Sequence, residues 1–263
     1  MKVSRRSVLG AAAMAPVAAM AKAAPAAARA KAAPATLKVG DRLARFDLLK
    51  PGAHSYLRSR EKDGAHIATD IWRREVRFET VDGVAKMRIL QRWDGTGAKP
   101  SLVTRDSLFE PGTWRPSTHL RISTVDDKRT VEGFLFEPAR ITAMPGVADN
   151  SRADFTVSFD EPMFNFETDM EMLGTLPLAA GYAVSIPFYH PGAPKPGRYL
   201  WTVAGDERLP GPDGRAIDCW IVECDYNSGG KPTRFWYAKR TQQFIKLEGH
   251  APDGAIHRKT LLS

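Results

Sequence analysis

Histidine is the side chain best suited to metal binding and to acid–base chemistry near neutral pH, and this chain carries six of them. No two are spaced as H-x-H or H-x-x-x-H, and none has a cysteine companion, so the local sequence offers no metal site. The G-x-S-x-G, glycine-rich phosphate-loop and G-x-G-x-x-G patterns are absent as well. The sequence therefore predicts no cofactor, no metal and no catalytic residues. It leaves open only an enzyme whose active site is assembled from distant residues.

Paired carboxylates could act as a general acid and base across a cleft. Asp160 with Glu161, and Asp169 with Glu171, are the pairs that qualify. We interpret the first pair as part of a solvated turn and the second as the exposed face of a short helix. His190 ends an apolar strand at a Pro-Gly turn, where the rim of a cavity would lie. We expect this histidine to form hydrogen bonds there rather than to act in catalysis.

The chain has two cysteines, Cys219 and Cys224. If residues 217–226 form a strand, side chains five positions apart point to opposite faces of the sheet. The two thiols then cannot reach each other without breaking the strand. We expect both to be buried as small apolar groups and not to be joined in a disulfide. No cysteine lies near the amino terminus, so we expect no lipoprotein anchor.

Residues 165–173 interrupt a pattern that is otherwise typical of strands. Asn165 is a good N-cap, and Phe166, Met170 and Leu173 fall at i, i+4 and i+7 on one side of a helix. Gly174 would end that helix. We expect a short helix that plugs the open mouth of a curved sheet. Such an apolar face occurs in packed cores, and it also occurs over ligand cavities, where methionine adapts to variable apolar ligands.

The candidate ligand-binding residues are this segment and the side chains expected to face it. They are Met163, Phe164, Phe166, Met170, Leu173, Phe188, His190, Trp201 and Trp236. We expect Trp201 and Trp236 to point inward from their strands. An empty apolar cavity on the order of a few hundred Å³ would favour ligand binding, whereas a packed core would favour an interaction module.

Most of the chain alternates between apolar and polar residues, the period of strands with one face in water. The clearest case is Trp72, Val76 and Phe78, which alternate with Arg73, Glu75, Arg77 and Glu79 before the turn Asp82–Gly83 and the run Ala85, Met87 and Ile89. Similar segments occupy residues 102–109, 117–123, 130–136, 155–159, 183–189, 198–203, 216–226, 233–238, 243–247 and 255–261. Turn-forming residues separate most of them.

Many short strands at hairpin spacing predict a mainly β protein. We expect a curved antiparallel sheet that forms a half-barrel or a barrel-like sandwich. One or two short helices would cover its concave face. About 225 residues remain after the amino-terminal segments described next, enough for one large β domain with a real core.

The amino-terminal segment matches the twin-arginine leader of exported bacterial proteins. Arg5 and Arg6 precede an apolar, alanine-rich run at 8–20 that is too short to span a hydrocarbon core of about 30 Å. Small residues at Ala21 and Ala23 predict cleavage before residue 24, and other Ala-x-Ala sites follow closely. We therefore expect a periplasmic protein whose first partners are the twin-arginine export machinery and signal peptidase.

These signals predict three parts of the chain. The parts are a signal peptide at 1–23, a disordered Ala/Pro-rich linker at 24–36 and a single β domain at 37–263.

The net positive charge of the chain comes mostly from its amino-terminal end. The first 35 residues contain six of the 38 lysines and arginines and none of the 30 acids, which leaves 32 basic against 30 acidic residues. This balance gives no reason to expect a nucleic acid partner, whose binding needs a clustered basic surface. No later apolar run is long enough to span a bilayer, so we do not expect the processed protein to be membrane-embedded.

Several stretches resemble a known family. They are R-L-P-G-P-D-G-R-A-I-D-C-W at 208–220, F-W-Y-A at 235–238 and F-I-K-L-E at 244–248, with S-L-F-E-P at 107–111 and W-R-P at 114–116 resembling its middle hairpin. The family is one of uncharacterised periplasmic domains of unknown function, related to the lipoprotein-carrier (LolA/LolB-like) half-barrel fold. The resemblance implies an apolar cavity and a non-catalytic role with lipids, lipoproteins or other hydrophobic molecules of the envelope.

Three functions follow from these patterns. The first is binding or carriage of a hydrophobic ligand, such as a lipid or a lipoprotein acyl chain, in an apolar cavity. The second is a structural or protein-interaction module of the cell envelope. The third is an enzyme with a non-local active site, which would show titratable residues converging in a cleft.

Overall fold

The computed structural model describes residues 33–262 apart from 98, 100, 212–213 and 226–230. The signal peptide expected at 1–23, with Arg5, Arg6, Ala21 and Ala23, lies outside the described residues. Most of the expected linker lies outside them too. Its last two residues, Ala35–Thr36, form a short strand.

Sixteen strands and three short helices form the described part of the chain. The first nine strands are β1 (Ala35–Thr36), β2 (Gly52–Lys62), β3 (Ala65–Val81), β4 (Val84–Gly95), β5 (Ser101–Phe109), β6 (Pro116–Val125), β7 (Lys128–Phe136), β8 (Arg140–Ala143) and β9 (Thr156–Ser158). The other seven are β10 (Phe164–Asn165), β11 (Ala183–Tyr189), β12 (Gly197–Pro210), β13 (Ala216–Cys224), β14 (Thr233–Ala238), β15 (Phe244–His250) and β16 (Ile256–Leu261). The helices are η1 (Phe46–Leu48), η2 (Phe166–Thr168) and α1 (Asp169–Gly174).

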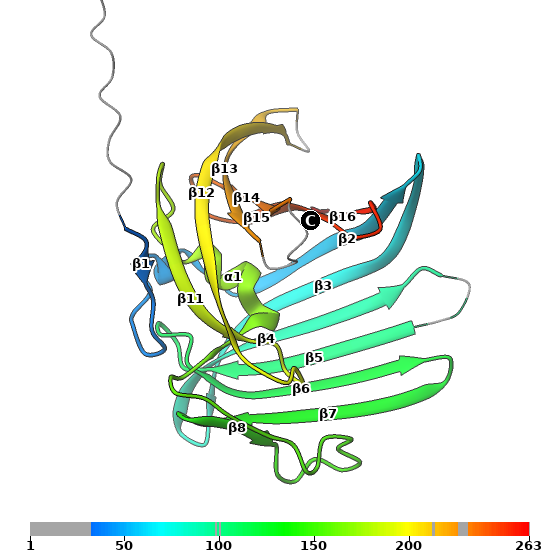
Figure 1. Cartoon of the computed structure of the whole chain (residues 1–263), viewed down its shortest axis with the longest axis vertical. Coiled ribbons are helices and arrows are strands. Elements are labelled where there is room, and N and C mark those ends of the chain that lie inside the picture. Colours follow the sequence, from blue (N-terminus) through cyan, green and yellow to red (C-terminus); the bar gives the residue numbers. More distant parts are fainter. Residues whose placement is uncertain (1–32, 98, 100, 212–213, 226–230, 263) are drawn as a thin grey trace, which may run out of the picture. The chain divides into compact units, whose positions relative to one another are not determined.

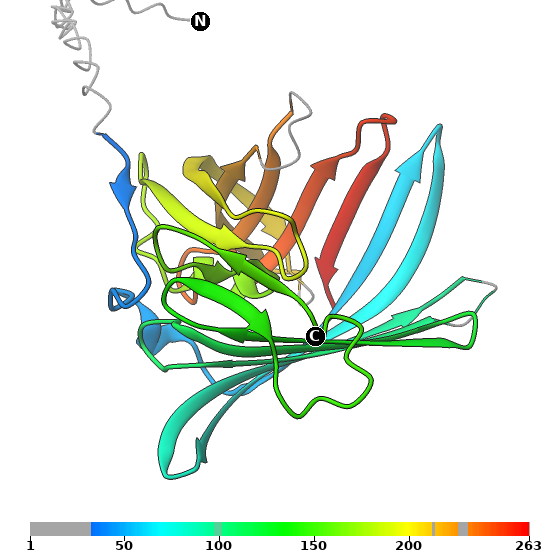
Figure 2. The ribbon, with the colours of Figure 1, turned by 60° about the horizontal axis from the view of Figure 1, so that its bottom comes forward.

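Consecutive strands pair as antiparallel neighbours in two runs, β2 to β9 and β11 to β16. Pairing of β16 with β2 joins the two runs into one sheet, while β1 and β10 add to β11 in parallel. The ends of the order, β1 and β9, do not pair with each other, so the sheet curves without closing (Figure 1). Figure 2 shows the bend from the β4–β7 part (green) through β2 and β3 to β15 and β16 (red). The mainly β, curved antiparallel fold expected from the sequence is confirmed.

Local sequence explains the tight hairpins. Asp63–Gly64 and Asp82–Gly83 both have positive φ at the two turn residues, 51° and 77° in the first and 49° and 77° in the second. This is the type I′ geometry, whose twist matches that of the strands it joins. The turn predicted at Asp82–Gly83 is therefore present, and it sets the register of β3 against β4.

Strand β3 shows how the two faces of the sheet differ. Trp72 and Val76 are buried on the inner face, whereas Arg73 is exposed on the outer face, as alternation predicts. Arg74 occupies the inner position between the two apolar residues and is only 2% exposed. The inner face therefore carries charge as well as apolar side chains.

The helical segment lies within the curve of the sheet (Figure 1). Asn165 caps it, because its side-chain oxygen accepts a hydrogen bond from Glu167 N at 3.0 Å. The helix ends at Gly174, as expected. A Cβ at this position would lie 2.7 Å from the carbonyl oxygen of Gln242, so the close approach of the β14–β15 turn requires glycine.

The core is packed around this segment. Phe166, Met170 and Leu173 belong to the main apolar cluster, with exposures of 8%, 1% and 0%. Aromatic side chains of β11, β12 and β14 surround them. A smaller cluster centres on Phe134 and Tyr189. The apolar stripe predicted from its helical spacing is therefore core.

The two cysteines of β13 are buried and form no disulfide with each other, as their spacing predicts. Cys224 belongs to the main apolar cluster, which does not include Cys219. No helix in the described ranges is long and apolar enough to cross a membrane.

Candidate functional site

One side of the helical segment faces a polar surface built by the inner positions of β3 to β6. Arg74 of β3 forms two charge-assisted hydrogen bonds with Glu171 through Nε and Nη2. Its Nη2 also donates to the carbonyl oxygen of Glu167 at 3.1 Å, and Gln91 Nε2 donates to the same oxygen at 2.7 Å. These bonds fix the position of η2 and α1 on the sheet.

Glu167 attaches the helical segment to the sheet at a second point. Its carboxylate lies 2.6 Å from Arg105 Nη1 and 3.6 Å from Arg121 Nη1. Burial alone would raise the pKa of Glu167, but the neighbouring Arg105 and Arg121 outweigh it and hold that pKa below its usual range. Burial lowers the pKa of Arg105 to about 10, although Glu167 opposes the shift. Both groups therefore stay charged at neutral pH.

Two tryptophans extend this polar surface. Arg74 lies over the ring of Trp72 at 4.4 Å and Lys259 lies over it at 4.5 Å, while Arg58 and Arg105 lie 4.0 and 4.1 Å from the ring centre of Trp93. Cation–π contacts stabilise cations that have left bulk water. The inner face therefore holds buried cations by aromatic rings as well as by carboxylates.

Ser107 and His119 form a pair of the kind that nucleophilic enzymes use. The Ser107 Oγ lies 2.8 Å from His119 Nδ1, and Asn165 Nδ2 lies 3.3 Å from the same nitrogen. All three side chains are at most 1% exposed, so a substrate cannot reach them. Burial lowers the pKa of His119 to about 3. The cluster supports the start of the helical segment rather than chemistry.

The interpretation of Asp169 and Glu171 as an exposed helix face is wrong. Asp169 is 6% exposed and the Glu171 side chain 12%. Burial raises the pKa of Asp169, and burial lowers the pKa of Lys259, with the opposite charges of the two groups counteracting both shifts.

Asp160 and Glu161 lie elsewhere, and Glu161 pairs with Arg198. Among the described residues, no group of three His, Cys, Asp or Glu side chains could hold a metal.

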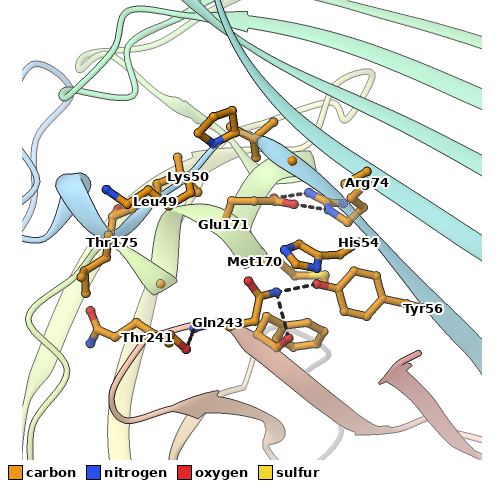
Figure 3. Close-up of a pocket in the computed structure, with 18 of the residues that line it drawn as sticks. Leu49, Lys50, His54, Tyr56, Arg74, Met170, Glu171, Thr175, Thr241 and Gln243 are labelled. Atoms are coloured by element: carbon orange, nitrogen blue, oxygen red, sulfur yellow. Dashed lines mark hydrogen bonds and ion pairs between the residues drawn. The ribbon is translucent and has the colours of Figure 1, made fainter. Parts of the chain in front are cut away.

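A partly open cavity of about 570 Å³ lies beside α1. Its wall comes from the segment that follows η1, from β2 and β3, from α1 and from the turn between β14 and β15 (Figure 3). Tyr56, Met170 and Phe244 give one part of the wall an apolar surface. Gln243 Nε2 donates to the Tyr56 hydroxyl at 3.0 Å and fixes the two sides relative to each other.

Other parts of the cavity wall are polar. The Arg74–Glu171 pair lies along one side, and Lys50 lies in another part of the wall (Figure 3). Lys50 and Arg240 are both exposed lining residues. Gln242 is 3% exposed, and neither atom of its side-chain amide has a partner in the described structure. Leaving such a group unsatisfied costs about 1–3 kcal/mol. The wall thus combines apolar surface with hydrogen-bonding groups.

The structure places most of the candidate ligand-binding residues away from this cavity. Met170 is on its wall. Phe164, Phe166, Leu173, Phe188 and Trp201 are in the main core cluster, and Met163 is in the smaller one. The space beside Leu173 and Trp201 is too small for a water molecule. The expected site between these residues is therefore packed core, and the open volume lies on the other side of α1.

His190 and Trp236 also differ from their expected positions. His190 stacks on the Phe166 ring at 3.7 Å and does not border the cavity. Trp236 is on the opposite face of β14 from Phe235 and Tyr237, which fill the core. Its Nε1 donates to Glu207 at 2.7 Å, and Lys246 lies over its ring. The inward position expected for Trp236 is therefore taken by its two neighbours.

The cavity residues on η1, β2 and the β14–β15 turn were not identified from the sequence. They lie in segments about 190 positions apart, which the β16–β2 pairing and the Gln243–Tyr56 hydrogen bond bring together. One signal was present in the sequence: Arg74 interrupts the inner face of an otherwise apolar alternation. A charged residue on a core face indicates a buried partner or a site.

Comparison with known proteins bears on this fold. A family model described as protein of unknown function (DUF3108) matches residues 55–256. The chain belongs to the DUF3108 family. The DUF3108 match spans β3 to β15 in full and includes α1 and the β14–β15 turn of the cavity wall.

Among solved structures, the DUF3108 chain is similar to a beta-barrel-like protein of domain of unknown function DUF1849 from Brucella abortus. The two share 11% sequence identity with a TM-score of 0.50, over 85% of this chain and 98% of that one. At this identity the likeness shows the fold alone. No curated protein matches the sequence.

Proposed function

We propose that this protein is exported to the periplasm by the twin-arginine route and binds a hydrophobic ligand, such as a lipid or an acyl chain, in the cavity beside α1. The observation that carries the proposal is the cavity itself. Its volume of about 570 Å³ is within the range of small-molecule sites, about 300–1,000 Å³. The relation to lipoprotein carriers belongs to this proposal, and the open curved sheet with a helix inside it supports that relation.

The wall of the cavity suits a hydrophobic ligand for two reasons. Tyr56, Val76, Met170 and Phe244 are buried residues of rigid elements, so their apolar surface is in place before a ligand binds. Met170 adds a flexible, polarisable side chain that fits ligands of variable shape. The ligand would then bind beside the packed core, and the core would keep its shape.

Filling the cavity tests the proposal. His54 lies on the cavity wall in β2, and His54→Trp should occupy part of the volume (Figure 3). Binding of the neutral fluorophore N-phenyl-1-naphthylamine should weaken by about tenfold, equivalent to about 1.4 kcal/mol. His66→Trp is the matched control, because His66 is an exposed residue of the same hairpin away from the cavity. No binding to the wild-type protein, or equal loss in both variants with unchanged melting temperatures, would contradict the proposal.

The route of export is tested separately. Replacing both Arg5 and Arg6 by lysine should leave unprocessed precursor in the cytoplasm, because the twin-arginine machinery reads the arginine pair. Fractionation and immunoblotting show whether the signal peptide has been removed and where the protein is. Normal processing of the double variant would rule out this route.

A further inference from the structure

Charges on the cavity wall do not balance. Among the described lining residues, Lys50, Arg74 and Arg240 are cationic and Glu171 is the one acid. Arg74 and Glu171 neutralise each other through their paired hydrogen bonds. Lys50 and Arg240 therefore give the cavity an excess of positive charge. Low-dielectric walls strengthen the potential that such an excess creates.

Nearby cations have carboxylate partners, but these two do not. Lys239, next to Arg240 in sequence, is 2.6 Å from Asp206, and Lys246 is 3.4 Å from Glu248. No described carboxylate is within ion-pair distance of Arg240. Within the described ranges, the one acceptor of Lys50 Nζ is the carbonyl oxygen of Asp47, at 2.6 Å. The unpaired charge is thus on two exposed residues of the cavity wall.

The buried polar groups of the wall are mostly donors as well. Arg74 is 2% exposed, and its Nη1 has no partner in the described ranges. Gln242 is 3% exposed, and its Nε2 donor and its Oε1 acceptor both have no partner there, so two of these three unpaired atoms are donors. A donor-rich wall is completed by a ligand that supplies several acceptor oxygens. Carboxylates and phosphates do so, and their hydrogen bonds to cations are stronger than those of neutral groups.

Resting on the proposed function, we propose that the ligand is an anionic amphiphile. Its acidic head group binds Lys50 and Arg240, and its apolar chain packs against Tyr56, Met170 and Phe244. Lys50 precedes β2 and Arg240 lies in the β14–β15 turn, so the site exists only when both runs of the sheet are joined. The shared chemistry of the head group is a carboxylate or a phosphate.

Displacement of N-phenyl-1-naphthylamine by dodecanoate, dodecyl phosphate and dodecanol tests the inference. All three have twelve carbons and are used below the critical micelle concentrations of the two anions and the solubility limit of dodecanol, at a pH that ionises the acids. In the wild-type protein, the better of the two anions should displace the probe at about tenfold lower concentration than dodecanol. Whichever anion is the better competitor identifies the head group. Added salt should reduce the advantage, because both cations are exposed.

Substituting the two cations tests whether they cause the preference for anions. Lys50→Gln with Arg240→Gln should abolish the advantage of the anions, so that dodecanoate, dodecyl phosphate and dodecanol displace the probe at similar concentrations. Lys128→Gln with Arg129→Gln is the matched control, since it makes the same charge change on exposed residues of β7 away from the cavity. That control should keep the advantage.

The outcomes separate this inference from the function on which it rests. Wild-type protein that binds the probe but does not prefer anions would overturn the head-group inference and leave the proposed function standing. A preference that survives in the Lys50/Arg240 variant would overturn the assignment to these residues. Wild-type protein that binds neither the probe nor any amphiphile would overturn both.

Discussion

The two sides of the helical segment Phe164–Gly174 differ in how they are held. Toward β11–β15 the segment packs through Phe166, Met170 and Leu173 in an apolar, aromatic core. Toward β3–β6 it is held by ion pairs that Glu167 and Glu171 form with buried arginines. Apolar burial is non-directional, so it stabilises the segment without fixing its exact position. Bidentate ion pairs are directional and specify one orientation, which the cavity beside α1 requires.

The largest loss of stability is expected from substitutions on the apolar side of the helical segment. Met170→Asp with Leu173→Asp would place two charges at positions that are 1% and 0% exposed, the first of them beside Lys259, whose Nζ is 3.9 Å from Met170 Sδ. The charge at 173 alone costs several kcal/mol, against a whole domain stability of about 5–15 kcal/mol. Circular dichroism and thermal melts should show an unfolded protein. A folded double variant would mean that the segment opens as a flap and that the comparison between its two sides does not hold.

The ionic side should respond differently to single and double changes. Arg74→Met leaves Glu171 buried without its partner and should cost about 3–5 kcal/mol in urea unfolding. Combining it with Glu171→Met removes both charges and should recover most of that loss, because two apolar groups need no partner. A double variant as unstable as the single one would show that Glu171 is not the group that depends on Arg74.

Acid should lower the unfolding free energy through His119, which contacts Asn165 at the start of the helical segment. Its pKa is about 3 in the folded protein and about 6.5 in an unfolded chain. As pH falls below about 6.5, the unfolded state binds a proton that the folded state does not, so stability is lost until the folded pKa is reached. The difference in unfolding free energy between wild type and His119→Gln should fall by about 1.4 kcal/mol per pH unit between about pH 6 and pH 4. A difference that stays constant over that interval would contradict this origin.

The smallest effect is expected from the residue beside Arg74. Arg73 lies on the outer face of β3, where it is 3.5 Å from Glu75 and its side chain is 56% exposed. Arg73→Met should change the unfolding free energy by no more than about 0.5 kcal/mol. An effect comparable to that of Arg74→Met would show that the two faces of β3 do not differ as described.

Signals between near neighbours in the sequence specify much of the local structure. Alternation predicted most of the longer strands, although β3 begins and β12 ends seven residues beyond the predicted bounds. It missed β2, in which Arg58 and Arg60 obscure the pattern, and the short strands β1, β8 and β10. Asp82–Gly83 predicted a hairpin, and Asn165 with Gly174 predicted the limits of the helix. These features depend on φ preferences, capping bonds and period, all of which act between near neighbours.

Which buried residues fill a core and which border a cavity depends on contacts between distant parts of the chain. Met170 and Leu173 have the same helical spacing signal, yet one borders the cavity and the other lies beside a space too small for water. Asp169 and Glu171 looked like solvated acids until β3 brought Arg74 against them. The cavity itself needs Lys50 and Arg240 in one place, and that depends on the pairing of β16 with β2. Periodicity reports which face a side chain is on, but it carries no information about what the sheet later places opposite that face.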